Sequence, residues 1–220
     1  MKRSILIGCC FLIILSCKDL GDSIQISEDF TIQTIIEIMK KPTTISKEKL
    51  AEIAEADEEK IKIYNENFSP DVSKRMVLYS WPNGQKESIK TRSGKELNIE
   101  KFNSLGMGLV KRISKKDFQN QFESKDFVQS EIDRITNDQS VDADIAISEA
   151  KYLAKNSKIQ KFEKWENIGE SAYWETPVNA LHVFVDGISF TVTTNFPDEK
   201  LSRNKAIAFT KLIIENPLNN

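Results

Sequence analysis

Two apolar segments separated by a two-residue turn constrain the fold of this chain more than any other feature. The segments are "LHVFV" at 181–185 and "ISFTVTT" at 188–194, and only Asp186-Gly187 lies between them. Because this dipeptide tolerates the positive φ angles of a type I′ turn, the two segments are predicted to form an antiparallel hairpin. A closing helix is predicted at about 199–215, with an inward face made by Ala206, Phe209, Leu212 and Ile213.

Further strands are predicted upstream of this hairpin. Four segments have the apolar pattern of strands, namely 61–64, 76–81, 159–165 and 171–174. Pro82-Asn83-Gly84 has the composition of a turn, so "ESIKT" at 87–91 is predicted to be the return strand of a second hairpin.

Helices are predicted before these strands and between them. Ser27 is predicted to cap an N-terminal helix at 28–43, and Ser46 a second helix that ends at about Ala56. Residues from about 100 to 156 are predicted to form a helical insertion that lies over the sheet. Helices before and after a meander of strands indicate an α+β fold, with helices packed on an antiparallel sheet.

The N-terminal segment has the layout of a secretory signal. Lys2 and Arg3 precede an apolar run at 5–15, which as a helix would cover only about half of a bilayer core. The run closes with Ile14-Leu15-Ser16-Cys17, which resembles the lipobox of bacterial lipoproteins in its aliphatic residue, its small residue and its cysteine. Leu15 departs from that pattern, because small residues are commoner there.

The lipobox resemblance implies a cleaved signal peptide at 1–16 and a mature chain that starts at Cys17, with acyl chains on its thiol. Residues 17–27 are then a lipidated tether. Inner-membrane lipoproteins often have aspartate at the position of Lys18, so this lysine favours the outer membrane. It does not decide between the periplasmic face and the surface face of that membrane. A plain secretory signal or a short uncleaved anchor is the alternative interpretation.

The aromatic segments carry a second resemblance. "MVLYSWPNG", "WENIGESAYW" and "LHVFVDGISFTVTTN", followed by the closing helix, resemble a loose group of extracytoplasmic α/β lipoprotein domains with a fold akin to the PsbP-like sandwich. The resemblance covers about 44–216 of an α+β domain assigned to 44–220. It implies a fold and no catalytic chemistry.

Cysteine usage, charge and glycine spacing argue against several kinds of site. The cysteines are Cys9, Cys10 and Cys17, so nothing after residue 17 supplies a thiolate for zinc or for nucleophilic attack. The 31 basic and 33 acidic residues are interleaved, which argues against nucleic-acid binding. Gly106 and Gly108 lack the third glycine of a nucleotide loop and are expected to loosen a turn. No cofactor or metal is predicted.

Two other candidate groups are interpreted as structural. His182 is expected on a sheet surface or in a cap, since no orienting aspartate or nucleophile elbow is near it in the sequence. The acidic residues Asp138, Asp142, Asp144 and Glu149 could ligate calcium, but the glycine of an EF-hand loop is missing. Helix capping by Asp142 or Asp144 is therefore the favoured role.

Trp174 and Tyr173 are predicted to contribute an interaction surface. They are neighbours on a strand, so their side chains point to opposite faces of the sheet. A loop containing Pro177 follows at once, and one of the pair is therefore expected outside. Trp81 and Trp165 are expected in the core.

Together these features predict a non-enzymatic, membrane-anchored envelope lipoprotein that acts as a binding or accessory module. Its expected partners are the membrane, through Cys17, and an envelope protein. The alternative is an immunity or inhibitor lipoprotein that neutralises a toxin at the envelope. A hydrolase that works through paired carboxylates is a third hypothesis.

Overall fold

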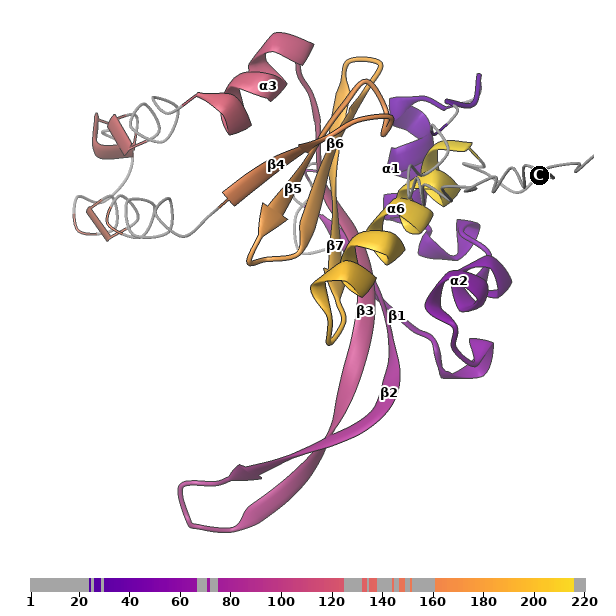
Figure 1. Ribbon diagram of the computed structural model, residues 1–220, viewed down its shortest axis with the longest axis vertical. Coiled ribbons are helices and arrows are strands. Elements are labelled where there is room, and N and C mark those ends of the chain that lie inside the picture. Colours follow the sequence, from indigo (N-terminus) through magenta and orange to yellow (C-terminus); the bar gives the residue numbers. More distant parts are fainter. Residues whose placement is uncertain are drawn as a thin grey trace, which may run out of the picture.

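The computed structural model describes residues 24–215, except for 25, 29, 67–70, 72–74, 125–131, 134, 138–143, 145–146, 149–150 and 152–160. The described residues form a seven-stranded antiparallel sheet with helices on both of its faces (Figure 1). The α+β class with helices packed on an antiparallel sheet is therefore confirmed.

Two meanders make up the sheet. The strands are β1 Lys62–Glu66, β2 Met76–Lys90, β3 Glu96–Arg112, β4 Lys161–Trp165, β5 Ser171–Thr176, β6 Ala180–Val185 and β7 Ile188–Asn195. Their spatial order is β1-β2-β3-β7-β6-β5-β4, so the meanders join where β3 pairs with β7. The predicted hairpin between β6 and β7 is confirmed, because Val185 pairs with Ile188 and Asp186-Gly187 has φ angles of 47° and 70°.

Three helices cover one face of the sheet and enclose the main core. They are α1 Ile32–Lys40, α2 Lys47–Ala54 and α6 Glu199–Glu215, with the short 3-10 turns Pro42–Thr44 and Glu58–Lys60 between α1 and β1. The bounds predicted for α6 are confirmed. Tyr79 of β2 lies beneath these helices, where its ring meets Phe209 edge-on and its hydroxyl donates to the Pro42 carbonyl at 2.9 Å. Burial raises the pKa of Tyr79, so the phenol remains a hydrogen-bond donor.

Helix α3, Lys115–Glu123, packs on the other face of the sheet. Ser114 caps it by accepting a hydrogen bond from the Asp117 amide. The buried Phe118 ring lies 5.8 Å from the ring of Tyr173 and 5.5 Å from that of Phe184. The sheet is therefore enclosed on both sides around β5 and β6.

The long strands β2 and β3 differ most from the sequence-based expectation. β2 continues through Pro82-Asn83-Gly84 without reversing, because Gly84 with φ 77° forms part of a bulge there. The chain reverses only at 91–95. The predicted turn and the return strand at 87–91 are therefore wrong. Residues 100–112, predicted as helix, belong to β3.

The same strand explains why Gly106 and Gly108 are glycines. They lie inside β3 rather than in a turn, so that expectation is wrong. A Cβ on Gly106 would come within 2.5 Å of the Thr193 hydroxyl on β7, and one on Gly108 within 2.8 Å of Met76 on β2. The two glycines therefore leave room for the side chains of Thr193 and Met76, which lie against the backbone of β3.

Helix boundaries supply two further comparisons. Thr31, not Ser27, caps α1 by accepting from the Thr34 amide, so the helix is shorter than the predicted 28–43. Ser46 caps α2 as predicted. Within the predicted insertion, 115–123 is helical, and most of 125–160 lies outside the described residues.

Candidate functional site

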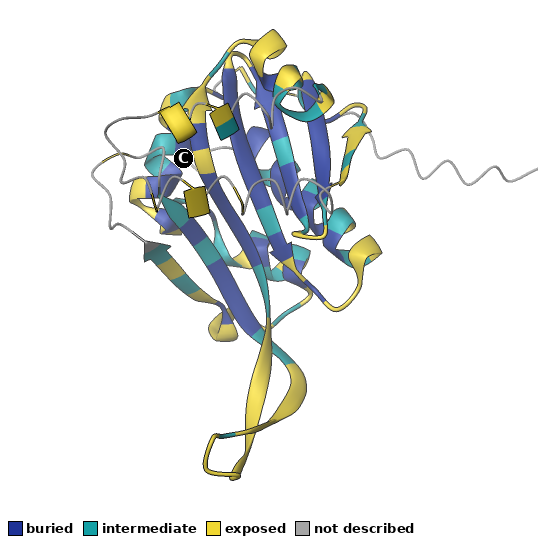
Figure 2. Ribbon diagram, turned by 90° about the vertical axis from the view of Figure 1, so that its left-hand side faces the viewer, coloured by how far each residue is buried: buried dark blue, intermediate teal, exposed yellow. Residues whose placement is uncertain are grey.

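A two-stranded ribbon, residues 82–102 of β2 and β3, projects beyond the body of the molecule (Figure 1). β1 pairs with β2 only up to Ser80, and β7 pairs with β3 only from Ser104 onward. The ribbon therefore has no third strand within the described part of the chain. At about 3.3 Å per residue, the six steps of β3 from Phe102 to Glu96 reach about 20 Å; the two extra residues in the bulge of β2 add no length. Figure 2 shows that it is exposed over most of its length.

The two faces of the ribbon differ in chemistry. Ile89 pairs with Leu97, and Glu87 pairs with Ile99, so these four side chains share one face. We call Ile89, Leu97 and Ile99 the apolar row; their exposed fractions lie between 39% and 46%. The opposite face carries only polar and charged side chains beyond the bulge, namely Lys86, Ser88, Lys90, Glu96, Asn98 and Glu100.

The apolar row continues the core-facing side of the sheet. Alternation along β3 places Leu97, Ile99 and Asn103 on the same side as Leu105 and Met107. Leu105 and Met107 are fully buried in the main core, whereas the row lies where the helical layer no longer covers the strands (Figure 1). One side of β3 is thus a core surface at one end and an uncovered apolar surface at the other.

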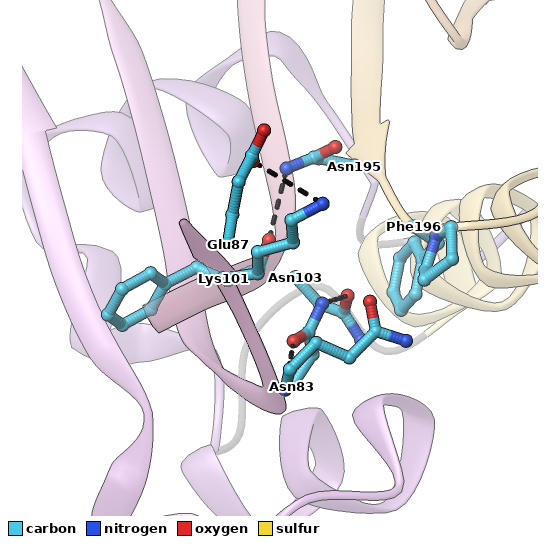
Figure 3. Close-up of a pocket in the computed structure, with 9 residues that line it drawn as sticks. Asn83, Glu87, Lys101, Asn103, Asn195 and Phe196 are labelled. Carbon is cyan, nitrogen blue, oxygen red and sulfur yellow. Dashed lines mark hydrogen bonds and ion pairs between the residues drawn. The ribbon is translucent and has the colours of Figure 1, made fainter. Parts of the chain in front are cut away.

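A hollow of about 320 Å³ lies at the base of the ribbon (Figure 3). Glu87 and Lys101 of the ribbon form an ion pair at its edge, with oxygen and nitrogen 3.4 Å apart. Deeper in the hollow, the Asn83 side-chain amide donates to Asn103 Oδ1 at 3.2 Å, and Asn195 lines the β7 side. A neighbouring hollow of about 290 Å³ shares Asn83 and Asn103. Side-chain amides suit this region to hydrogen bonding with a polar surface.

The carboxylates that line these hollows have cationic neighbours. The ion pairs are Glu87 with Lys101, Glu55 with Lys205 and Asp57 with Lys60. The hydrolase hypothesis requires two acids that face each other across a cleft. Among the described residues, these hollows hold no such pair.

Trp174 and Tyr173 are both buried, with exposed fractions of 0% and 2%, so the prediction that one of them lies outside is wrong. The reason is that helices cover both faces of β5. Trp174 stacks on Trp165 with ring centroids 6.0 Å apart. The Arg203 guanidinium of α6 lies over both rings, 5.3 Å from Trp174 and 5.4 Å from Trp165.

Tyr173 instead fastens α3 to the sheet. Its hydroxyl donates to the Glu123 carboxylate at the end of α3, and Lys164 lies 3.4 Å from the same carboxylate. Burial, together with the bond to Glu123, raises the pKa of Tyr173 to about 12, so the phenol stays a donor at neutral pH. The hydrogen bond from Tyr173, aided by Lys164, lowers the pKa of Glu123.

Acidification is expected to loosen α3. Because the pKa of Glu123 is lower in the folded protein than in the unfolded chain, its stabilising effect is present above the unfolded value, about 4.3, and is lost as the pH falls further. Hydrogen exchange of the amides of 115–123, followed from pH 6 to pH 3, measures this. Glu123→Gln keeps an acceptor for Tyr173 and should remove this part of the pH dependence; an unchanged dependence would contradict the assignment.

His182 lies on the sheet face that α3 covers, and its side chain is only 14% exposed. Its Nε2 is 2.8 Å from a Glu175 carboxylate oxygen, and its Nδ1 is 3.0 Å from the Thr191 hydroxyl oxygen. The Phe122 ring covers it, with centroids 4.8 Å apart. Sequence reasoning sought an aspartate near His182 and missed Glu175, which reaches it across the β5–β6 pairing.

The remaining predicted sites lie mostly outside the described residues. These are the lipidation site Cys17 and the acidic residues Asp138, Asp142 and Glu149. Asp144 is described; it is helical and exposed. Among the described residues, no helix is long and apolar enough to cross a membrane, and no group of His, Cys, Asp and Glu is arranged to hold a metal. No protein-family model, curated protein or solved structure matches the chain.

Proposed function

We propose that this chain is a lipid-anchored bacterial envelope protein that holds a protein partner with its ribbon and carries out no catalysis of its own. The observation that carries the proposal is the apolar row. Three aliphatic side chains lie on one face of a projecting structure, away from the core that they would otherwise help to build. An apolar surface with a polar rim is the usual anatomy of a protein interface.

The charges of the ribbon favour a protein partner over an anionic polymer or membrane. Cross-strand ion pairs join Lys90 to Glu96 at 3.7 Å on one face and Lys101 to Glu87 at 3.4 Å on the other, so the surplus of basic charge is confined mainly to Arg92 and Lys95 at the tip. A nucleic acid or an anionic lipid surface would be bound mainly through unneutralised basic groups. A partner strand could also extend the ribbon, because main-chain pairing at a free edge adds affinity.

The lipobox pattern at Ile14-Leu15-Ser16-Cys17 supports the anchor and, with Lys18, placement at the outer membrane. Helices on both faces of one antiparallel sheet support the PsbP-like relation proposed for about 44–216. The fold relation itself assigns no activity.

A charge placed in the apolar row is expected to weaken partner binding without unfolding the body. Ile99→Asp puts a carboxylate into the proposed interface, and we expect affinity to fall at least about tenfold, which is about 1.4 kcal/mol. Asn98→Asp places the same charge on the opposite face of the same strand and serves as the matched control. Photo-crosslinking from positions 99 and 98 in cells of the source bacterium, followed by titration of the captured protein, measures both.

Three results would oppose the proposal. Equal crosslinking from the two positions would show that the apolar row is not the interface. Equal loss of affinity in both variants would show a non-specific charge effect. Sedimentation of the soluble form with lipid vesicles, at an affinity that Ile99→Asp weakens and Asn98→Asp does not, would assign the row to a membrane instead.

Immunity against an envelope toxin is a second candidate function, favoured by the reach of the ribbon. A two-stranded hairpin about 20 Å long can enter a cleft in another protein. Deletion of the gene should then remove protection against competing strains. Unchanged survival of the deletion strain would reject this candidate and leave the accessory function untouched.

A further inference from the structure

A separate hollow of about 140 Å³ lies between α3 and the sheet, beneath the Phe118 and Phe122 rings of the helix. His182 and Thr191 line its sheet side, and on another side Lys111 donates a hydrogen bond of 2.9 Å to Gln121 of α3. An apolar cavity of about 150 Å³ holds a molecule with one aromatic ring. The space is thus large enough for a small organic molecule.

One buried polar group in this hollow has no partner. Ser189 is 3% exposed, and its hydroxyl makes no hydrogen bond with any described residue. A buried hydroxyl without a partner is costly and rare, so it needs an explanation. Ser189 lines the hollow, so rotation of its hydroxyl toward a bound molecule would supply the missing hydrogen bond.

The neighbouring hydroxyl of Thr191 is already oriented. Thr191 and Ser189 are two residues apart on β7, so both side chains point to the face covered by α3. The Thr191 hydroxyl and Nδ1 of His182 share one hydrogen bond of 3.0 Å, in which the hydroxyl either donates or accepts. In both cases the Thr191 oxygen keeps a lone pair that can accept a further hydrogen bond, while Ser189 has a proton to donate.

The rim of the hollow is strained. Leu109, which lines it, has φ 54° and sits in a bulge of β3 between Gly108 and Lys111. This left-handed conformation is unfavourable for a leucine, and the bulge leaves the side chain 54% exposed. Strained residues and bulges concentrate at binding sites, and an apolar ligand would cover this side chain.

The geometry points to a binding site for a small neutral molecule that has one aromatic ring or a short aliphatic chain and ends in a hydroxyl group. The apolar body lies against Phe118, Phe122 and Leu109. The hydroxyl accepts from Ser189 and donates to Thr191. This site is independent of the ribbon and of the partner proposed for it.

Phenol and toluene, which have the same shape, test the site. In NMR titrations of the soluble form that begins at Lys18, phenol should shift the amide signals of 109–111 and 189–191 saturably. Toluene, which lacks the hydroxyl, should bind about fivefold more weakly. Ser189→Ala should remove this preference without lowering the thermal unfolding temperature, because the hydroxyl that it removes has no partner.

Ser202→Ala is the matched control, since Ser202 is also a buried serine without a hydrogen-bond partner but lies on α6, in the other layer. It should leave the preference for phenol unchanged. Three results would overturn the inference: no saturable binding of phenol through the millimolar range, equal affinity for phenol and toluene, or signal changes that centre away from these two segments.

Discussion

Replacing Trp174 with alanine is expected to lower the free energy of unfolding by about 3–5 kcal/mol. The side chain is fully buried and stacks on Trp165, and Arg203 lies over both rings. Arg203 is held there by Glu163 at 2.6 Å and Glu199 at 2.8 Å. Removing the indole therefore opens a cavity and also frees the contact that fastens α6 to β4 and β5. Urea unfolding followed by circular dichroism measures the loss.

Trp165→Ala is the control for this prediction. It removes the same stacking and the same guanidinium contact, but Trp165 is only half-buried, so we expect a loss of about 1–2 kcal/mol. The difference between the two variants reports the burial of Trp174. A loss below about 1 kcal/mol for Trp174→Ala would contradict its position in the core.

Gly169→Ala is expected to cost about 2–4 kcal/mol, a large effect for one added methyl group. Gly169 has φ 58°, which penalises any side chain. The added Cβ would also come within 2.6 Å of Val185 Cγ2 and 2.7 Å of the Phe184 carbonyl oxygen. That carbonyl accepts a hydrogen bond from the Glu170 amide at 2.9 Å, so it cannot move without weakening the attachment of the loop between β4 and β5, and the Val185 side chain is fully buried.

Gly187→Ala separates the two causes. Gly187 has φ 70° but no atom within 4 Å of an added Cβ, so it should show the backbone penalty alone, about 1–2 kcal/mol. Thermal unfolding of both variants, converted to free energies, gives the comparison. If the two glycines respond equally, the contact with Val185 and Phe184 has no energetic weight.

Local signals predicted the C-terminal part of the fold well. A two-residue turn admits few alternatives, and the β6–β7 hairpin and α6 form where the sequence indicates. The ribbon was not predicted, because Pro82-Asn83-Gly84 fixes only a local backbone shape. The same positive φ at Gly84 serves a reversal or a bulge, and the long-range pairing with β3 decides between them.

The candidate sites also divide into features that local sequence patterns predict and features that depend on long-range contacts. Alternation correctly placed Tyr173 and Trp174 on opposite faces, but it carries no information about a second helical layer, so their burial was not predicted. The pairing of His182 with Thr191 could have been found by counting back from Val185 and Ile188 on either side of the turn. Glu175 could not, because its approach to His182 depends on how β5 registers with β6.

The position of Ile24 determines how the ribbon would be oriented relative to the proposed membrane anchor. The Ile24 amide bonds to the Asn167 carbonyl in the loop between β4 and β5, at the end of the sheet where β6 turns into β7, and the ribbon leaves from the opposite end (Figure 1). Seven peptide steps separate Ile24 from Cys17, a leash of at most about 25 Å. If the proposed anchor is in a membrane, the end of the sheet near Ile24 lies close to the lipid surface. The ribbon at the opposite end then points away from the membrane, toward partners in the aqueous phase.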